Sequence, residues 1–210
     1  MTDARGPDWV EIGAALLLAF AAVATAWSSY QANRWNGEQA KGSARVNKTR
    51  IDAARASGLA NSQQQVDVAT FSQWVDAYAR GERRLVTFYR QRFRREFKPA
   101  FAAWIATKPL KTKGAPLTPF AMPQYRLASK EEAERLDLVA EGLSAGVRRD
   151  IQRSSNYVLC VVLFAVSLFF AGISTRLTAP SLRAAMLGIG VALFLGTVVW
   201  IATFPVSVAV

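Results

Sequence analysis

The sequence predicts an all-α integral membrane protein with three transmembrane helices, the first two of which extend into a soluble domain built as a helical hairpin or bundle. Three apolar segments without charged residues predict the spans, at residues 12–29, 157–174 and 185–204. A helix of about 20 apolar residues crosses the roughly 30 Å hydrocarbon core of a bilayer. A chain of 210 residues is too short to bury these helices inside a soluble core.

Charge and hydropathy divide the chain into successive parts. The first segment is disfavoured as a cleaved signal peptide because the residues before it are net acidic, whereas signal peptides begin with a basic region. The expected parts are a tail with the first span (1–29), a basic helical domain (30–155) that contains a Pro-rich loop (107–127), the second span (156–174), a short hairpin (175–183), and the third span with an apolar tail (184–210).

The first helix is expected to begin near Trp9 and to run well beyond the membrane, over about residues 9–58. No proline interrupts it after the apolar segment, and most of its residues are good helix formers. Trp27, Tyr30 and Trp35 lie where the apolar segment ends and the chain is expected to leave the bilayer. Amphipathic aromatic rings are enriched at the membrane–water interface, so these three residues are predicted to anchor the helix there.

The soluble domain is expected to continue with a turn and a second helix. Several weak helix formers and a capping-box spacing indicate a turn at 57–62, followed by a helix over 63–98. Lys98-Pro99 would end or kink that helix before a short helical segment at 101–106. Residues 107–127 hold four prolines and predict an extended loop, which either packs as a structural strap or serves function.

The last soluble helix is predicted to run directly into the second span. A second capping-box pattern at 129–132 marks its start, and no proline separates it from the span, so one helix is expected over 129–174. The segment 175–183 then forms a hairpin into the third span.

Small and polar residues recur along the first helix in alternating steps of four and three. This 3.5-residue period keeps one face toward a partner, and small residues let membrane helices approach closely. The stripe packs either against another span or a second copy of the chain, or several copies surround an axis and it lines a narrow conduit. Its members are Ala15, Ala19, Ala22, Ala26, Ser29, Asn33, Asn36 and Ala40.

The soluble domain carries the whole net charge of the protein. Residues 30–154 hold 23 Lys or Arg against 12 Asp or Glu, which is +11. This charge is either solvated and paired within the domain, or bound to anionic lipid headgroups near the membrane. Nucleic acid is disfavoured, because no nucleic-acid-binding motif is present. The candidate headgroup residues are Arg80, Arg83, Arg84, Arg90, Arg92, Arg94, Arg95 and Lys98.

The residues that most enzymes use are missing from this sequence. There is no histidine, and the single cysteine, Cys160, lies in the second span, which excludes histidine-based acid–base catalysis and Cys/His metal sites. No nucleotide-binding glycine motif is present, so neither a cofactor nor a metal is expected. Carboxylates cluster only at Glu131, Glu132 and Glu134, where a helix N-terminus favours them; chemistry that uses carboxylates alone is the one enzymatic alternative.

Short stretches of the chain resemble a group of uncharacterised bacterial three-span membrane proteins with a long helical insert between the first and second spans. The resemblance rests on residues 27–40, 92–110, 118–126 and 156–174. It implies the same architecture and a bacterial inner-membrane location, and carries no known activity. Arg176 and Arg183 in the short hairpin favour placing the hairpin on the cytoplasmic side, whereas the basic domain and the acidic N-terminus favour a cytoplasmic domain, which is the orientation expected here.

Two functions therefore follow as hypotheses. The first is a non-enzymatic inner-membrane protein that acts as an oligomeric scaffold or holds a membrane-protein partner. The alternative is a channel-like or gating component in which the first helix lines a conduit. Transport coupled to protons is disfavoured, because the three spans contain no ionisable residue of the kind that marks such pathways.

Overall fold

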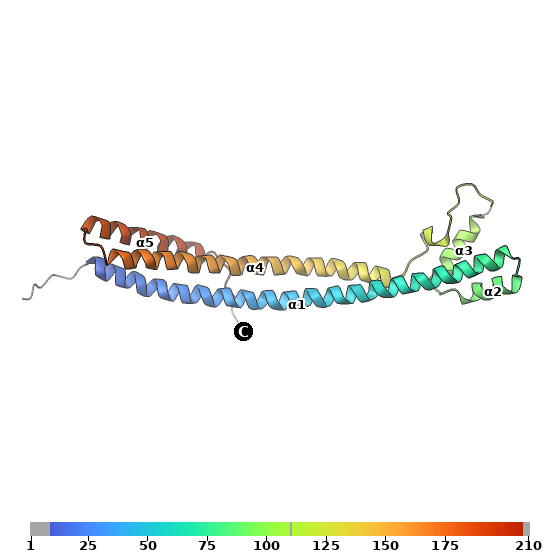
Figure 1. Cartoon of the computed structure of the whole chain (residues 1–210), viewed down its shortest axis with the longest axis horizontal. Coiled ribbons are helices and arrows are strands. Elements are labelled where there is room, and N and C mark those ends of the chain that lie inside the picture. Colours follow the sequence, from blue (N-terminus) through green and yellow to red (C-terminus); the bar gives the residue numbers. More distant parts are fainter. Residues whose placement is uncertain (1–8, 110, 208–210) are drawn as a thin grey trace, which may run out of the picture. The chain divides into compact units, whose positions relative to one another are not determined.

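A computed structural model describes residues 9–109 and 111–207, and in these residues the fold is entirely helical, without strands (Figure 1). The helices α1, α4 and α5 are each long and apolar enough to cross a membrane, as the sequence predicts. The elements are α1 (Trp9–Ala79), α2 (Arg83–Arg92), α3 (Lys98–Ala106), the 3-10 turn η1 (Pro119–Ala121), α4 (Ala128–Ser174) and α5 (Pro180–Ile201).

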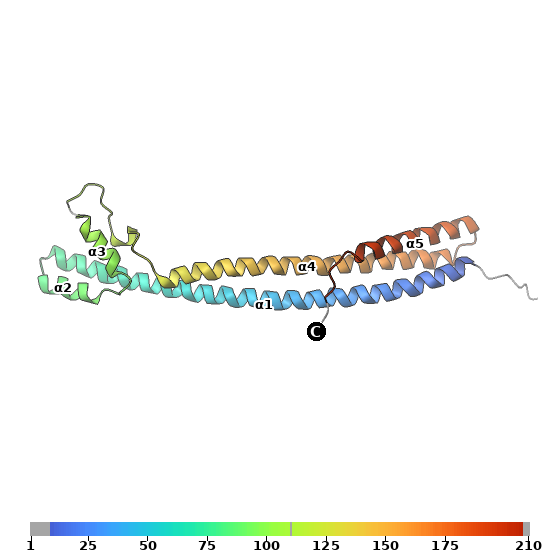
Figure 2. The same cartoon turned by 180° about the vertical axis from the view of Figure 1, so that it is seen from behind.

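The chain forms two compact units, each built from both halves of the sequence. Residues 1–44 and 143–210 make up the first, here the membrane unit, which contains the three apolar segments. Residues 45–142 make up the second, here the basic unit, with 18 Lys or Arg against 10 Asp or Glu. Within each unit, a part of α1 runs beside a part of α4 (Figures 1 and 2).

The membrane unit is held together by a seam of mostly small residues. Along α1 the buried positions Ala14, Ala21, Ser28 and Trp35 are seven residues apart, the spacing that keeps one helix face toward a partner. The buried residues of α4 in this unit, which contact α1 or α5, are Ser154, Tyr157, Cys160, Phe164, Ser167, Ala171 and Ser174.

Serine hydroxyls on α4 bind the backbone of both neighbouring helices. Ser154 Oγ donates to the carbonyl of Ala32 at 3.1 Å and to Asn36 Oδ1 at 2.8 Å. Ser167 Oγ donates to the carbonyl of Gly190 at 2.8 Å. Such bonds require close helix approach, which small residues permit.

The helix α1 has no turn near residue 60, so the break expected at 57–62 is wrong. Instead the buried series continues in the basic unit through Val46, Ala53 and Ala60. Gln63 also accepts a hydrogen bond from Ser129 at 2.8 Å. Packing against the start of α4 therefore overrides the weak helix propensity of this stretch, which for one glycine costs only about 1 kcal/mol.

The helix α1 ends instead at Ala79, and Gly81, two residues later, lies in the left-handed region with φ 75°. The amide of Gly81 donates to the carbonyl of Tyr78 and that of Glu82 to the carbonyl of Ala77, at 3.1 and 3.0 Å. This pair of bonds is a Schellman motif, in which glycine at the left-handed position satisfies the last helix carbonyls. The single helix expected over 63–98 is therefore divided here.

Pro99 begins a helix rather than ending one, which also corrects the prediction. It lies in the first turn of α3, where a proline loses no helix hydrogen bond and already has the required φ. The preceding helix, α2, ends before it at Phe93, whose ψ of 140° is extended.

The helix predicted over 129–174 is confirmed as α4, and the third span is confirmed as α5, which begins at Pro180. The predicted capping box at 129–132 is wrong, because α4 starts one residue earlier and Ser129 donates to Gln63. Glu132 instead pairs with Arg135 at 2.6 Å.

Candidate binding pocket in the basic unit

The core of the basic unit is a cluster of aromatic rings from α1, α3 and the short segment between α2 and α3. Phe71 and Trp104 meet edge to face with ring centroids 5.4 Å apart, and Trp74 and Phe101 do so at 4.8 Å. Edge-to-face pairs add about 0.5–1.5 kcal/mol each beyond the area that they bury. The buried members of this aromatic cluster are Phe71, Trp74, Phe93, Phe97, Phe101 and Trp104.

The Pro-rich loop packs onto this cluster, as expected for a structural strap. Its Phe120, Met122 and Tyr125 contact the aromatic cluster, and Pro119 is buried. The Trp104 indole Nε1 donates to the carbonyl of Pro116 at 2.7 Å. These contacts fix the loop against the helices on which it lies.

A buried carboxylate joins three parts of this unit. Asp67 on α1 is fully buried, and its Oδ2 accepts from Arg94 Nη1 at 2.9 Å and from the Tyr125 hydroxyl at 3.1 Å. Arg94 also pairs with Glu96. Asp67 Oδ1 has no hydrogen-bond partner in the described part of the chain.

Burial controls the ionisation of this group. Burial raises the pKa of Asp67, although the neighbouring Arg94 guanidinium opposes the increase. Burial, and then the charge of Asp67, also raise the pKa of Tyr125 well above its usual range. Tyr125 is thus a hydrogen-bond donor at neutral pH, and the network acts as a structural joint.

Beside the aromatic cluster lies a pocket of about 1010 Å³. Its wall is formed mainly by apolar and aromatic side chains, and Tyr78 and Gln91 are the only uncharged polar residues besides the two tryptophans. Its lining consists of Trp74, Val75, Tyr78, Val86, Arg90, Gln91, Phe93, Lys98, Phe101, Ala102, Trp104, Ile105, Lys108, Pro109 and Lys111.

Four cations and no carboxylate line this pocket, namely Arg90, Lys98, Lys108 and Lys111, here the basic rim. All four are exposed, and none forms an ion pair among residues 9–109 and 111–207. Lys98 is the first residue of α3, which has no acidic residue in its first turn. A cation at a helix N-terminus is unfavourable, so the rim concentrates positive potential.

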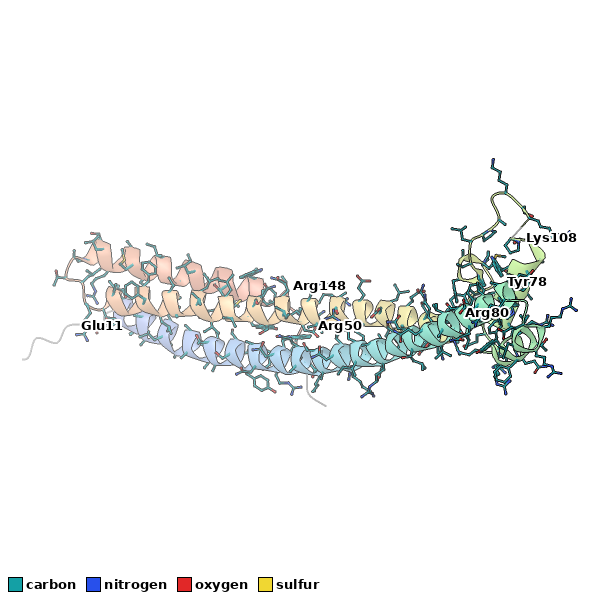
Figure 3. The ribbon with its side chains drawn as sticks, turned by 45° about the vertical axis from the view of Figure 1, so that its right-hand side comes forward. Glu11, Arg50, Tyr78, Arg80, Lys108 and Arg148 are labelled. Atoms are coloured by element: carbon teal, nitrogen blue, oxygen red, sulfur yellow. The ribbon has the colours of Figure 1, made fainter. Side chains whose placement is uncertain are left out.

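Lys108 has an uncommon backbone conformation for a lysine. It lies in the left-handed region with φ 51°, and its amide donates to the carbonyl of Ile105 at 3.0 Å. This bond turns the chain just beyond α3. Figure 3 labels Lys108 and, on α1, Tyr78, both of which line the pocket.

The eight predicted headgroup cations separate into three groups. Arg90 and Lys98 line the pocket, and Arg83, Arg84 and Arg95 are exposed. The others contact protein: Arg94 pairs with Asp67, Arg80 with Asp76 at 3.3 Å, and Arg92 lies 3.5 Å over the Phe88 ring. The turn near residue 60 that would have led these cations back toward the bilayer is absent.

The predicted small-residue stripe of α1 is not its packing face. In this chain Ala15, Ala19, Ala22, Ala26, Asn33, Asn36 and Ala40 are exposed, and Ser29 is half-buried. The seam with α4 instead uses Ala14, Ala21 and Ser28, each one residue before a member of the stripe. Of the stripe, Asn36 accepts a hydrogen bond from Ser154 of α4, but its other members lie outside the seam. Packing of the whole stripe against another span of the same chain is therefore wrong, whereas packing against a second copy stays a prediction.

Of the three predicted interface anchors, one packs inside the protein. Trp35 is 8% exposed, lies in a cluster with Tyr157, and is covered by the Arg153 guanidinium at 4.4 Å. Trp27 and Tyr30 are about half exposed, at 48% and 50%, and their place at the interface stays a prediction.

The basic, aromatic segment 80–98 is conspicuous in the sequence, but the pocket that it helps to form is not. Lys108 and Lys111 come from a loop, and Trp74 comes from α1, so no local spacing joins them. The mixture of arginines and aromatic residues in segment 80–98 was the one feature of the sequence that could have indicated a binding site there. Searches against family models, curated proteins and solved structures find no match to this chain, so its function has to be inferred from the site.

Proposed function

We propose that this chain is a non-enzymatic binding component of the bacterial inner membrane. The helices of the membrane unit anchor it, and the basic unit, in the cytoplasm, captures an anionic partner. The observation that supports this function is the pocket, which combines an aromatic wall with four cations that are not ion-paired within the described residues. Pockets with apolar walls and a few convergent polar groups are the usual form of a binding site.

A photo-crosslinking amino acid at Val75 tests this function in native membranes. Val75 lines the pocket and is 41% exposed, while Val68, on the same helix and 42% exposed, lies outside the lining. Crosslinks to an anionic molecule are expected from position 75 and not from position 68. They should be lost when Lys98 and Lys108 are both changed to glutamine. Equal crosslinking from both positions would reject the pocket as the binding site.

We also propose that the chain forms a homo-oligomer through the small-residue stripe. This face of α1 is small, polar in part and exposed in the single chain, and small residues favour close association of membrane helices. Ala22→Cys should form disulfide-linked dimers in native membranes, whereas Val23→Cys, off the stripe and 69% exposed, should not. Equal crosslinking at both positions would indicate random collision and remove this proposal.

The channel-like function is the second candidate, because the same exposed stripe carries the polar residues Asn33 and Asn36. Its test is ion flux in liposomes that contain the purified protein. Flux that falls in Asn33→Leu supports a conduit, while no flux, or flux unchanged by this substitution, rejects it.

A further inference from the structure

We infer that the pocket of the basic unit binds a single-chain amphipathic anion, namely a long acyl chain that ends in a carboxylate or a phosphate. This inference rests on the proposed binding function and names its ligand class. The acyl chain lies along Trp74, Phe93, Phe101 and Trp104, and the anionic head lies at the basic rim.

The wall of the pocket favours an acyl chain over a peptide. Every peptide residue brings a backbone N–H and C=O that need partners when buried. Away from the basic rim, the lining offers only Tyr78, Gln91 and the two indoles as uncharged polar side chains, and the Trp104 indole already donates to Pro116. An acyl chain has no polar atom below its head. Burial against this wall therefore leaves no polar group of the ligand without a hydrogen-bond partner.

The size of the pocket favours one chain of small-molecule dimensions. Ligand pockets usually measure about 300–1,000 Å³, and this one holds about 1010 Å³. That volume is typical of a single small ligand rather than of an extended polymer such as nucleic acid. The aromatic wall likewise offers apolar surface to a hydrocarbon chain and not to the repeated charges of a nucleic acid backbone.

The basic rim selects the charge of the head. Arg90, Lys98, Lys108 and Lys111 all line the pocket, and no carboxylate does so. A carboxylate or phosphate placed there gains charge-assisted hydrogen bonds. An uncharged head of the same size gains none, so acids are expected to bind better than their esters.

The experiment uses the full chain reconstituted in nanodiscs of neutral lipid and a palmitic acid that carries a diazirine and an alkyne. Labelled peptides are identified by mass spectrometry after illumination. Labelling within residues 74–105 is expected for the acid and for the corresponding lysophosphatidic acid, and at least about fivefold less for the palmitate methyl ester. The two acids distinguish a carboxylate from a phosphate ligand. Chains two methylenes shorter should compete about tenfold less well.

Two matched pairs of variants connect the labelling to the pocket. Ala102→Trp fills the pocket and should abolish this labelling, whereas Ala106→Trp, exposed on the same helix but outside the lining, should preserve it. Lys98→Gln with Lys108→Gln should weaken binding about tenfold. The exposed pair Arg83→Gln with Arg84→Gln changes the net charge equally and should have less than a twofold effect.

Three outcomes would overturn the inference. They are acyl labelling confined to the membrane unit, equal labelling by the acid and the ester, and equal loss in the two glutamine pairs. If the acyl probes do not label the pocket but position 75 crosslinks to an acidic protein segment, the proposed binding function is supported and the acyl ligand is rejected. If position 75 crosslinks to nothing, both fail.

Discussion

The two units of this chain use opposite kinds of side chain to hold their helices together. In the membrane unit, α1, α4 and α5 meet mainly through alanine, serine and glycine, and serine hydroxyls bind backbone carbonyls. In the basic unit, α1 carries Phe71 and Trp74 into an aromatic cluster and Asp67 into a buried ion pair. The environments explain the difference. Lipid provides no hydrophobic drive between helices, so close contact has to provide stability, whereas water favours the burial of large rings.

The largest effect should come from truncating the centre of the aromatic cluster. Phe97 is fully buried and packs against Phe71, Phe93 and Phe120. Phe97→Ala is expected to destabilise the basic unit by about 3–5 kcal/mol. Hydrogen exchange of the full chain in nanodiscs, read separately for each unit, should show faster exchange around α2 and α3 and no change in α5. Faster exchange throughout would mean that the two units unfold together.

A single added methyl should disturb the membrane unit. A Cβ at Gly190 would lie 3.2 Å from Leu17 Cδ2 and 3.3 Å from the carbonyl of Ser167. Overpacking of this kind costs about 1–3 kcal/mol, so Gly190→Ala should lower the thermal stability in mild detergent. Gly188→Ala is the matched control, because nothing lies within 4 Å of the added Cβ. Equal losses in both variants would show that helix packing at Gly190 is not tight.

The buried carboxylate of the basic unit should give this unit a pH dependence. Because burial raises the pKa of Asp67 above 3.8, the folded unit holds this proton more tightly than the unfolded chain. The stabilisation is therefore complete below about pH 3.8 and is lost as the pH rises through the folded-state pKa. Asp67→Asn cannot ionise, so its stability relative to the wild type should improve as the pH rises above 3.8. Denaturation curves that stay parallel across this range would contradict the assignment.

The smallest effect should be a stabilisation in the uninterrupted part of α1. Gly58 lies inside this helix, and nothing lies within 4 Å of a Cβ added to it. Gly58→Ala should therefore stabilise the protein by about 0.5–1 kcal/mol, measured as slower amide exchange around residue 58. Loss of stability would instead support the turn that the sequence alone suggests at 57–62.

The sequence was sufficient for the parts of the fold that local patterns determine. Charge-free segments of membrane-spanning length predict the three apolar helices, and the absence of proline predicts the continuous α4. The end of α1 was also within reach, because Gly81 is the residue type that a left-handed helix end requires.

Features that depend on a distant partner were beyond reach. In an alanine-rich helix, Ala14 and Ala15 are equivalent by composition, and only the packing against α4 and α5 makes the first buried and the second exposed. The pocket depends in the same way on contacts between α1, α3 and the loop that holds Lys111. Asp67 would have been read as a solvated charge, because its partners Arg94 and Tyr125 follow 27 and 58 residues later.

The unbroken course of α1 limits which changes in length the protein can accept. Each residue added to an α-helix rotates everything after it by about 100°. One residue inserted between Val46 and Ala60 would therefore turn Ala60 and Gln63 off the face of α1 that carries Val46, and so away from Ser129 on α4. Insertions or deletions of seven residues would restore the face, provided that α4 changed by the same amount. A library of length variants should thus recover folded proteins in steps of seven, with the intermediate lengths missing.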